Sequence, residues 1–218
     1  MPNDPPSRIK RNGVVDIGPG VLPDNLAGVI GEPDWAHVSG WTQLSGLRRT
    51  VTVIVPTLDE IGLLTTAVPV LSDLLTEYGF PWEVLFVDHG SRDGSAEQIE
   101  RWARLPGYRG LHVRASPDSG MGVVTALGLA RGDVVCLFAP GRFRMLGLLP
   151  EMLMRWEQGA WIVHLHQPAQ AEREILVHWG EDVVLPWLQQ YGFDVPPACR
   201  DFGLLDYRVV DRILSAPA

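Results

Sequence analysis

The sequence predicts a mostly parallel α/β fold in which one sheet is sandwiched by helices. Short apolar runs recur along the chain and alternate with segments of helical periodicity. The first run, residues 51–55, contains only Val, Thr and Ile, as is typical of a strand buried on both faces of a parallel sheet. Pro56 follows this run, and we expect the strand to end there because proline lacks a backbone N–H.

The other elements follow in order along the chain. Further strands are predicted over residues 82–87, 110–114, 133–138 and 161–166, and helices over residues 63–78, from 95 onward, 123–130 and 148–158. Pro69 lies within the first helix, so we expect that helix either to kink or to begin one turn before Pro69. Ser95 with Gln98 three residues later predicts a capping box at the start of the second helix.

The composition excludes several classes of function. The 218 residues carry 26 Asp and Glu against 18 Lys and Arg, a net charge of -8, so we expect no general attraction to nucleic acid. No apolar stretch approaches the roughly 20 residues that span a bilayer, and the first 15 residues are polar. We therefore expect no membrane span and a cytoplasmic location. Cys136 and Cys199 form no CxxC pair, which argues against metal-thiolate chemistry.

The chain divides into two parts by composition. Residues 1–48 are rich in Pro and Gly and show little periodicity, which predicts an irregular extension that drapes over the domain. We expect Trp35 and Trp41 to anchor this extension by packing. Residues 49–218 form the predicted domain.

Five motifs in this order resemble those of family 2 glycosyltransferases. They are VTVIVPTLDE, EVLFVDHGSRDGS, GMGVVTALGLARGDVV, LLPEMLMRWEQGAWIV and RDFGLLDYRVVDRIL. The chain is most similar to the dolichyl- or polyprenyl-phosphate mannose or glucose synthase group. The resemblance implies the GT-A fold and a nucleotide-sugar donor, a UDP- or GDP-hexose.

The resemblance also implies where the nucleotide binds. Two loops at the carboxyl ends of the first two strands hold it in such enzymes, which here gives Pro56, Thr57, Asp59, Glu60, Asp88, His89 and Asp93. Asp59 stands where the family pattern usually has Asn, and His89 stands where a second Asp usually contacts the base. An alternative remains open for Asp88 and Asp93, since aspartates in loops often bond their own backbone.

The region after the fourth strand departs from the family pattern. The family places a DxD-type carboxylate there to bind a divalent ion, whereas this chain has Ala139, Pro140 and Gly141, so we expect no divalent metal. Arg142 and Arg144 follow directly and could stabilise a diphosphate in place of the metal, because guanidinium binds phosphate well. The alternative is that both are ordinary solvated arginines.

Two further family positions lack their usual cation. Met121 stands where a lysine of a GKG-like segment is usual, and Gln167 stands where an arginine is frequent. Residues 173–190 are not basic, so a polyprenyl phosphate would find little to hold it, and a soluble or partner-delivered acceptor is expected.

His164 and His166 have the i, i+2 spacing that puts two strand residues on one face, which a metal site could use. Glu172 or Glu174 could supply a third ligand. The alternative is that both histidines are polar residues near a strand end.

Two functions remain in competition, and neither assigns a catalytic residue. One is a metal-independent, inverting glycosyltransferase. The other is a catalytically degenerate GT-A scaffold that acts as a binding or regulatory partner, because several charges that the transition state requires are missing together. A dinucleotide-dependent oxidoreductase is excluded, since no GxGxxG follows the first strand. The eight tryptophans leave room for a protein partner.

Overall fold

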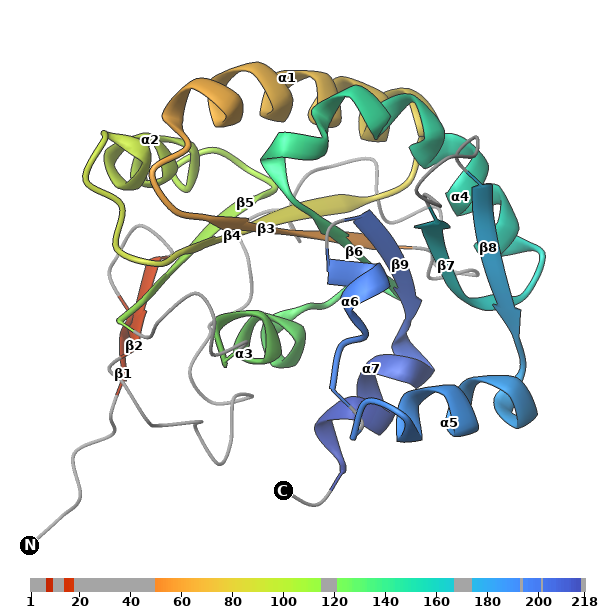
Figure 1. The fold of residues 1–218 in the computed structure, drawn as a ribbon. Helices are drawn as coiled ribbons and strands as arrows, with labels where there is room; N and C mark the ends of the chain where they lie inside the picture. The colour runs from red at the N-terminus through yellow and green to blue at the C-terminus, as the bar shows by residue number, and fades with distance from the viewer. Residues whose placement is uncertain are drawn as a thin grey trace, which may run out of the picture.

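The computed structural model describes residues 7–9, 14–17, 50–114, 121–166, 174–192, 194–200 and 202–216. In this part of the chain nine strands form one sheet with helices on both faces (Figure 1). The strands are β1 (Ser7–Ile9), β2 (Val14–Ile17), β3 (Val51–Thr57), β4 (Trp82–Asp88), β5 (Tyr108–Val113), β6 (Val134–Phe138), β7 (Ala160–His166), β8 (Glu174–Trp179) and β9 (Phe202–Asp206). The helices are α1 (Ile61–Tyr78), α2 (Ser95–Trp102), α3 (Met121–Leu129), α4 (Leu149–Glu157), α5 (Glu181–Gln189), α6 (Pro197–Arg200) and α7 (Tyr207–Leu214), with a 3₁₀ segment η5 (Pro140–Leu148).

The sheet has a parallel centre and antiparallel flanks, in the order β1-β2-β5-β4-β3-β6-β9-β7-β8. Strands β2, β5, β4, β3 and β6 all run in the same direction. Strand β9 pairs antiparallel to both β6 and β7, and β8 pairs antiparallel to β7. The prediction of a mostly parallel sheet between helices is confirmed for the centre of the fold.

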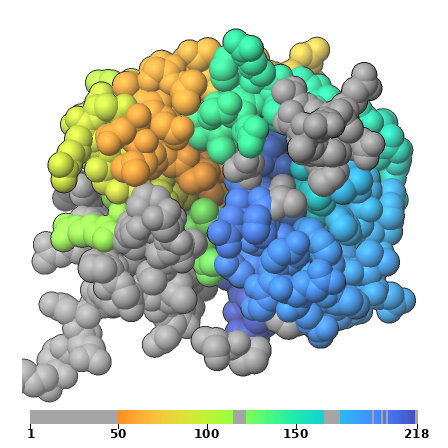
Figure 2. Space-filling view, in the orientation of Figure 1, coloured from red at the N-terminus to blue at the C-terminus, as the bar shows by residue number. Residues whose placement is uncertain are grey.

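Alternation along the central strands divides the interior into two apolar cores. Val53 and Val55 of β3 pack toward α1, α2 and α4, whereas Ile54 between them packs toward α3, α5 and α7. All three side chains are fully buried, which explains why residues 51–55 read as a continuous apolar run. The carboxyl-terminal residues, in blue, gather at the lower right of Figure 2, away from the orange residues of α1.

Three local predictions are wrong in detail. Strand β3 continues through Pro56 to Thr57, because at this level it pairs with β4 alone and one side of the strand needs no donor. Helix α1 extends from Ile61 to Tyr78 and contains Pro69, so the alternative that it begins one turn before Pro69 is wrong; Pro69 lies on the exposed face together with Thr65. The capping box is absent, since the N-cap residue of α2 is Gly94, with φ 98° and no side chain to bond the first turn.

Several elements were not predicted. Strand β8, strand β9 and helices α5 to α7 complete the carboxyl-terminal half, and two short strands, β1 and β2, lie in the extension that was expected to be irregular. Trp35, Trp41, Gln167 and Glu172 lie outside the described residues, as does the side chain of Met121. Within the described residues, no helix combines the length and the apolar character needed to cross a bilayer.

A buried ionic network ties the amino-terminal ends of the parallel strands together. Glu83 at the start of β4 accepts from Arg109 of β5 at 2.8 Å and from the Thr52 hydroxyl of β3 at 2.8 Å. The Glu83 carboxylate also accepts from the Arg131 backbone N–H at 3.1 Å, just before β6. These hydrogen bonds fix the relative positions of four strands at their amino-terminal ends. The loops at the carboxyl ends of the strands are therefore free to vary in sequence.

Candidate functional site

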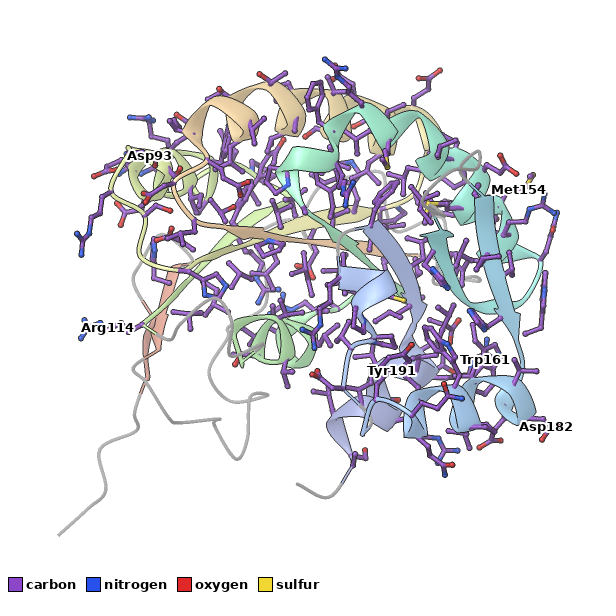
Figure 3. The ribbon with its side chains drawn as sticks, in the orientation of Figure 1. Asp93, Arg114, Met154, Trp161, Asp182 and Tyr191 are labelled. Carbon is purple, nitrogen blue, oxygen red and sulfur yellow. The ribbon has the colours of Figure 1, made fainter. Side chains whose placement is uncertain are left out.

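The loops after β3 and β4 lie together at the carboxyl edge of the sheet. The parallel register pairs Thr57 with Asp88, so both strands end at the same level. The backbone N–H of His89 then donates to the Thr57 carbonyl at 3.0 Å. Figure 3 shows Asp93 at this end of the molecule, above the ends of β3 and β4. The expectation that these two loops meet at one edge is therefore met.

Two carboxylates of this edge, Asp59 and Asp93, hold one loop against the other. An Asp59 oxygen accepts from the Arg92 backbone N–H at 2.6 Å, and an Asp93 oxygen accepts from the Ile61 backbone N–H at 2.8 Å. Asp93 also accepts from both the backbone N–H and the hydroxyl of Ser95, at 3.0 and 2.6 Å. These hydrogen bonds hold the pKa of Asp93 below its usual value. Asp93 thus satisfies the first turn of α2 in place of the expected capping box.

Asp59 adopts a backbone conformation that few residue types tolerate. Its φ is 52°, in the left-handed region, where short polar side chains such as Asp and Asn are the common non-glycine residues. Its own N–H donates to the Ser91 hydroxyl at 3.0 Å, which fixes the loop after β3 in this conformation.

Asp88 is buried at the end of β4 and pairs with a histidine that was not predicted as a site residue. One oxygen accepts from the Ser91 backbone N–H at 3.1 Å, and the other lies 2.9 Å from Nδ1 of His112 on β5. Burial alone would raise the pKa of Asp88, but the hydrogen bonds from His112 and Ser91 outweigh it and the pKa is lowered. Asp88 meets His112 because the register of β4 with β5 places these two residues opposite each other. A single sequence does not reveal that register.

His89 and His112 each bury a ring nitrogen that has no hydrogen-bond partner among the described residues: Nδ1 of His89 and Nε2 of His112. Because the Asp88 carboxylate can only accept, Nδ1 of His112 donates to it, and Nε2 is the ring nitrogen left for another group. The His89 ring lies against α3, where a Cβ added to Gly122 would come within 2.7 Å of it. Buried polar atoms of this kind call for a polar ligand or water.

Glu60 differs from the neighbouring carboxylates. Burial raises its pKa, a hydrogen bond from the backbone of Leu58 lowers it, and the charge of Asp93 raises it further, with a net increase. The Glu60 backbone N–H donates to the Ser95 hydroxyl at 3.2 Å, so the residue is held in place while its carboxylate stays half-buried. Pro56 and Thr57 lie within β3 itself, and the Thr57 side chain is buried.

The segment after β6 offers no side-chain ligand for a divalent ion where the family pattern places one. Ala139 precedes η5, and Pro140 and Gly141 begin it. Arg142 is half-buried and Arg144 is exposed, with its guanidinium 5.9 Å from the centre of the Phe143 ring. Both lie on η5, and Arg144 makes no hydrogen bond to the loops after β3 and β4 in the described part of the chain.

The histidine pair predicted as a metal alternative is arranged differently. Nε2 of His164 lies 3.1 Å from Nε2 of His178 on β8, and Trp187 of α5 stacks on the His178 ring at 4.5 Å between centres. The side chain of His166 is outside the described residues. No group of three or more His, Cys, Asp and Glu in the described chain is placed to hold a metal ion.

Comparisons with known proteins agree with the motifs. The model of glycosyl transferase family 2 matches residues 52–169, which include the loops after β3, β4 and β6. No curated protein matches the chain.

Among solved structures, the mannosyltransferase PcManGT from Pyrobaculum calidifontis in complex with GDP-Man and Mn²⁺ is 31% identical over 44% of this chain and 28% of its own, with a TM-score of 0.36. Glucosyl-3-phosphoglycerate synthase from Mycobacterium tuberculosis in complex with Mn²⁺, UDP and phosphoglyceric acid is 17% identical over 77% of this chain and 58% of its own, with a TM-score of 0.47. The chain therefore spans only part of the length of these proteins. Since the family model covers more than half of the sequence, this chain belongs to glycosyl transferase family 2.

Proposed function

We propose that this chain binds a nucleotide-sugar, a UDP- or GDP-hexose, at the carboxyl edge of β3 and β4, and that it transfers the hexose without a divalent metal. The observation that carries the proposal is the position of the two loops. They lie inside the segment that matches the family and are fixed to each other by the hydrogen bonds of Asp59 and Asp93. A pre-formed edge of this kind lowers the ordering cost of binding a ligand.

The polar groups that remain after these internal hydrogen bonds are the ones proposed to meet the ligand. Nε2 of His112 is proposed to meet a polar group of the base. The family's acidic residue at this place is replaced by His89, whose Nδ1 is buried without a described partner. The base would thus be recognised by the imidazoles of His89 and His112.

The diphosphate is assigned to arginine. Ala139, Pro140 and Gly141 do not fit a divalent ion through their side chains, so no step of the proposal passes through a metal. Arg142 and Arg144 lie on η5, the segment that leaves the same edge after β6. A guanidinium can stabilise both the bound diphosphate and the charge that develops as it leaves. The acceptor is proposed to be soluble or delivered by a partner.

A second candidate is favoured by a specific observation. The side chains of Asp59, Asp88 and Asp93 all accept hydrogen bonds from groups within the protein. A scaffold that has lost its ligand would retain such internal hydrogen bonds. In that case the GT-A fold serves as a binding or regulatory partner and transfers no sugar.

Thermal unfolding of the purified chain with UDP, GDP, TDP and their hexose conjugates separates these proposals. A ligand at 100 times its dissociation constant adds about 2.7 kcal/mol, which raises Tm by about 5–11 °C for a domain of this size. Binding as proposed gives a shift with one base in EDTA, and a His112→Gln variant loses it. The matched control is Arg212→Gln, a change at an exposed residue of α7 that pairs with Glu181 of α5, which should keep the shift.

Two further measurements test the catalytic part. An Arg142→Gln, Arg144→Gln double variant should weaken binding of the diphosphate forms while leaving the nucleoside alone unaffected. Release of the free nucleoside diphosphate from the identified donor reports transfer or hydrolysis. A shift that needs Mn²⁺ contradicts the metal-free proposal, and the absence of any shift from a cooperatively folded sample supports the scaffold.

A further inference from the structure

Strand β8 has an outer edge with the features of a pairing site. It is the last strand on its side of the sheet, and no other described strand pairs with its outer side. Strand β8 begins with Glu174, and its remaining residues, 175–179 (ILVHW), contain no Lys, Pro, Asp or Glu, the residues that commonly protect an exposed edge. A strand of this kind presents free N–H and C=O groups that another strand can use.

A groove of mixed polarity runs beside this edge, between β8 and α4. It has a volume of about 590 Å³ and is lined by Leu148, Glu151, Arg155, Leu165, Ile175, Val177 and Trp179. The Trp179 residue is 45% exposed, and Met154 of α4 is 43% exposed. Figure 3 shows Met154 next to α4 and β8, on the opposite side of the molecule from Asp93. An exposed tryptophan beside aliphatic side chains is typical of an interface.

We propose that a second copy of this chain covers the groove by pairing its β8 antiparallel to β8 across a two-fold axis at Val177. In this register Val177 lies opposite Val177 of the second copy, and Ile175 lies opposite Trp179 of the second copy. Residues that face each other across a strand pair lie on the same face, so the groove of each copy receives the tryptophan of the other. A sheet that continues across the axis is the result.

The charges of the groove fit a second copy. Its rim carries one acid and one base, Glu151 and Arg155, which lie 3.2 Å apart and are both about half exposed. Two copies therefore meet without net charge at the contact, although each whole chain carries -8. A two-fold contact is also closed, because each copy uses its only described free β8 edge and no further copy can add there. An edge that is covered in a closed dimer needs no protecting residues, whereas an edge left open to bind a peptide would need them.

Cysteine crosslinking tests the register on the full chain. Cβ atoms directly opposite in an antiparallel pair are about 4.5–5.5 Å apart, close to the separation of a disulfide, so Val177→Cys should link to itself under mild oxidation. Ile175→Cys is the matched control on the same face of the same strand. Its two copies would be about 13 Å apart at about 3.3 Å per residue, too far to link. The native Cys136 and Cys199 are buried and should not contribute.

The mass in solution tests the pairing itself without any substitution. Light scattering after size exclusion should give twice the chain mass of 24.1 kDa, and Trp179→Ser should lower the dimer fraction at least tenfold. A wild-type chain that stays monomeric overturns the proposal, as does a Val177→Cys variant that links no faster than Ile175→Cys. Either result would leave the groove to another occupant.

Discussion

Replacing Arg109 with methionine should cost more stability than any surface change, because it leaves a buried carboxylate without its charge partner. The side chains of Arg109 and Glu83 are only 11% and 4% exposed, and their closest atoms are 2.8 Å apart. Removing one partner of a buried ion pair typically costs about 3–5 kcal/mol. For a domain of this size that lowers Tm by about 6–20 °C.

Urea denaturation followed by circular dichroism measures this loss. The double variant Glu83→Gln, Arg109→Met removes the unpaired charge but keeps an acceptor for Thr52 and for the Arg131 N–H, so we expect it to recover more than half of the loss. The control Arg212→Met breaks an exposed pair with Glu181 and should cost under about 1 kcal/mol. The reasoning fails if Arg109→Met costs no more than this control, or if the double variant loses the sum of its single changes.

Three further predictions concern packing and protonation. Gly122→Ala should lose about 1–3 kcal/mol, because the added Cβ would lie 2.7 Å from the His89 ring, and adding His89→Ala should restore part of it in the same denaturation assay. Burial lowers the pKa of His178 below 6.5, so folding favours the neutral ring and the free energy of unfolding should decline as pH falls below about 6.5. The variant His178→Gln should flatten this decline. An unchanged slope in the variant would contradict the prediction. Burial raises the pKa of the Cys136 and Cys199 thiols, so neither should react with a thiol reagent at pH 8 until urea unfolds the chain, and rapid labelling of the folded protein would contradict their burial.

The central strands could be predicted from the sequence because their burial leaves a local signal. Apart from Thr52, residues 51–55 and 84–87 are apolar, since both of their faces pack against helices. The carboxyl-terminal strands gave no such signal. Strand β8 mixes His178 and Trp179 with aliphatic residues because one face meets α5 while the other borders a groove.

The candidate site was predictable in position but not in its contacts. Pro56, Thr57, Asp59, Glu60, Asp88, His89 and Asp93 do gather at one edge, because carboxyl ends of neighbouring parallel strands meet there. The role of His112 depends on the register of β5, and the pairing of His164 depends on a hairpin partner 14 residues away. Both are set by tertiary packing, which spacing along one sequence does not encode.

The left-handed backbone of Asp59 bears on how sequence variation at this position should be interpreted. A residue held at φ 52° is selected first for the conformations that its Cβ permits, so Asn, Asp and Gly are interchangeable there in a way that Ser or Glu is not. The change from the usual Asn to Asp59 therefore preserves the course of the main chain. A substitution at this position reflects the backbone conformation of the loop. It does not by itself indicate a gain or loss of sugar transfer.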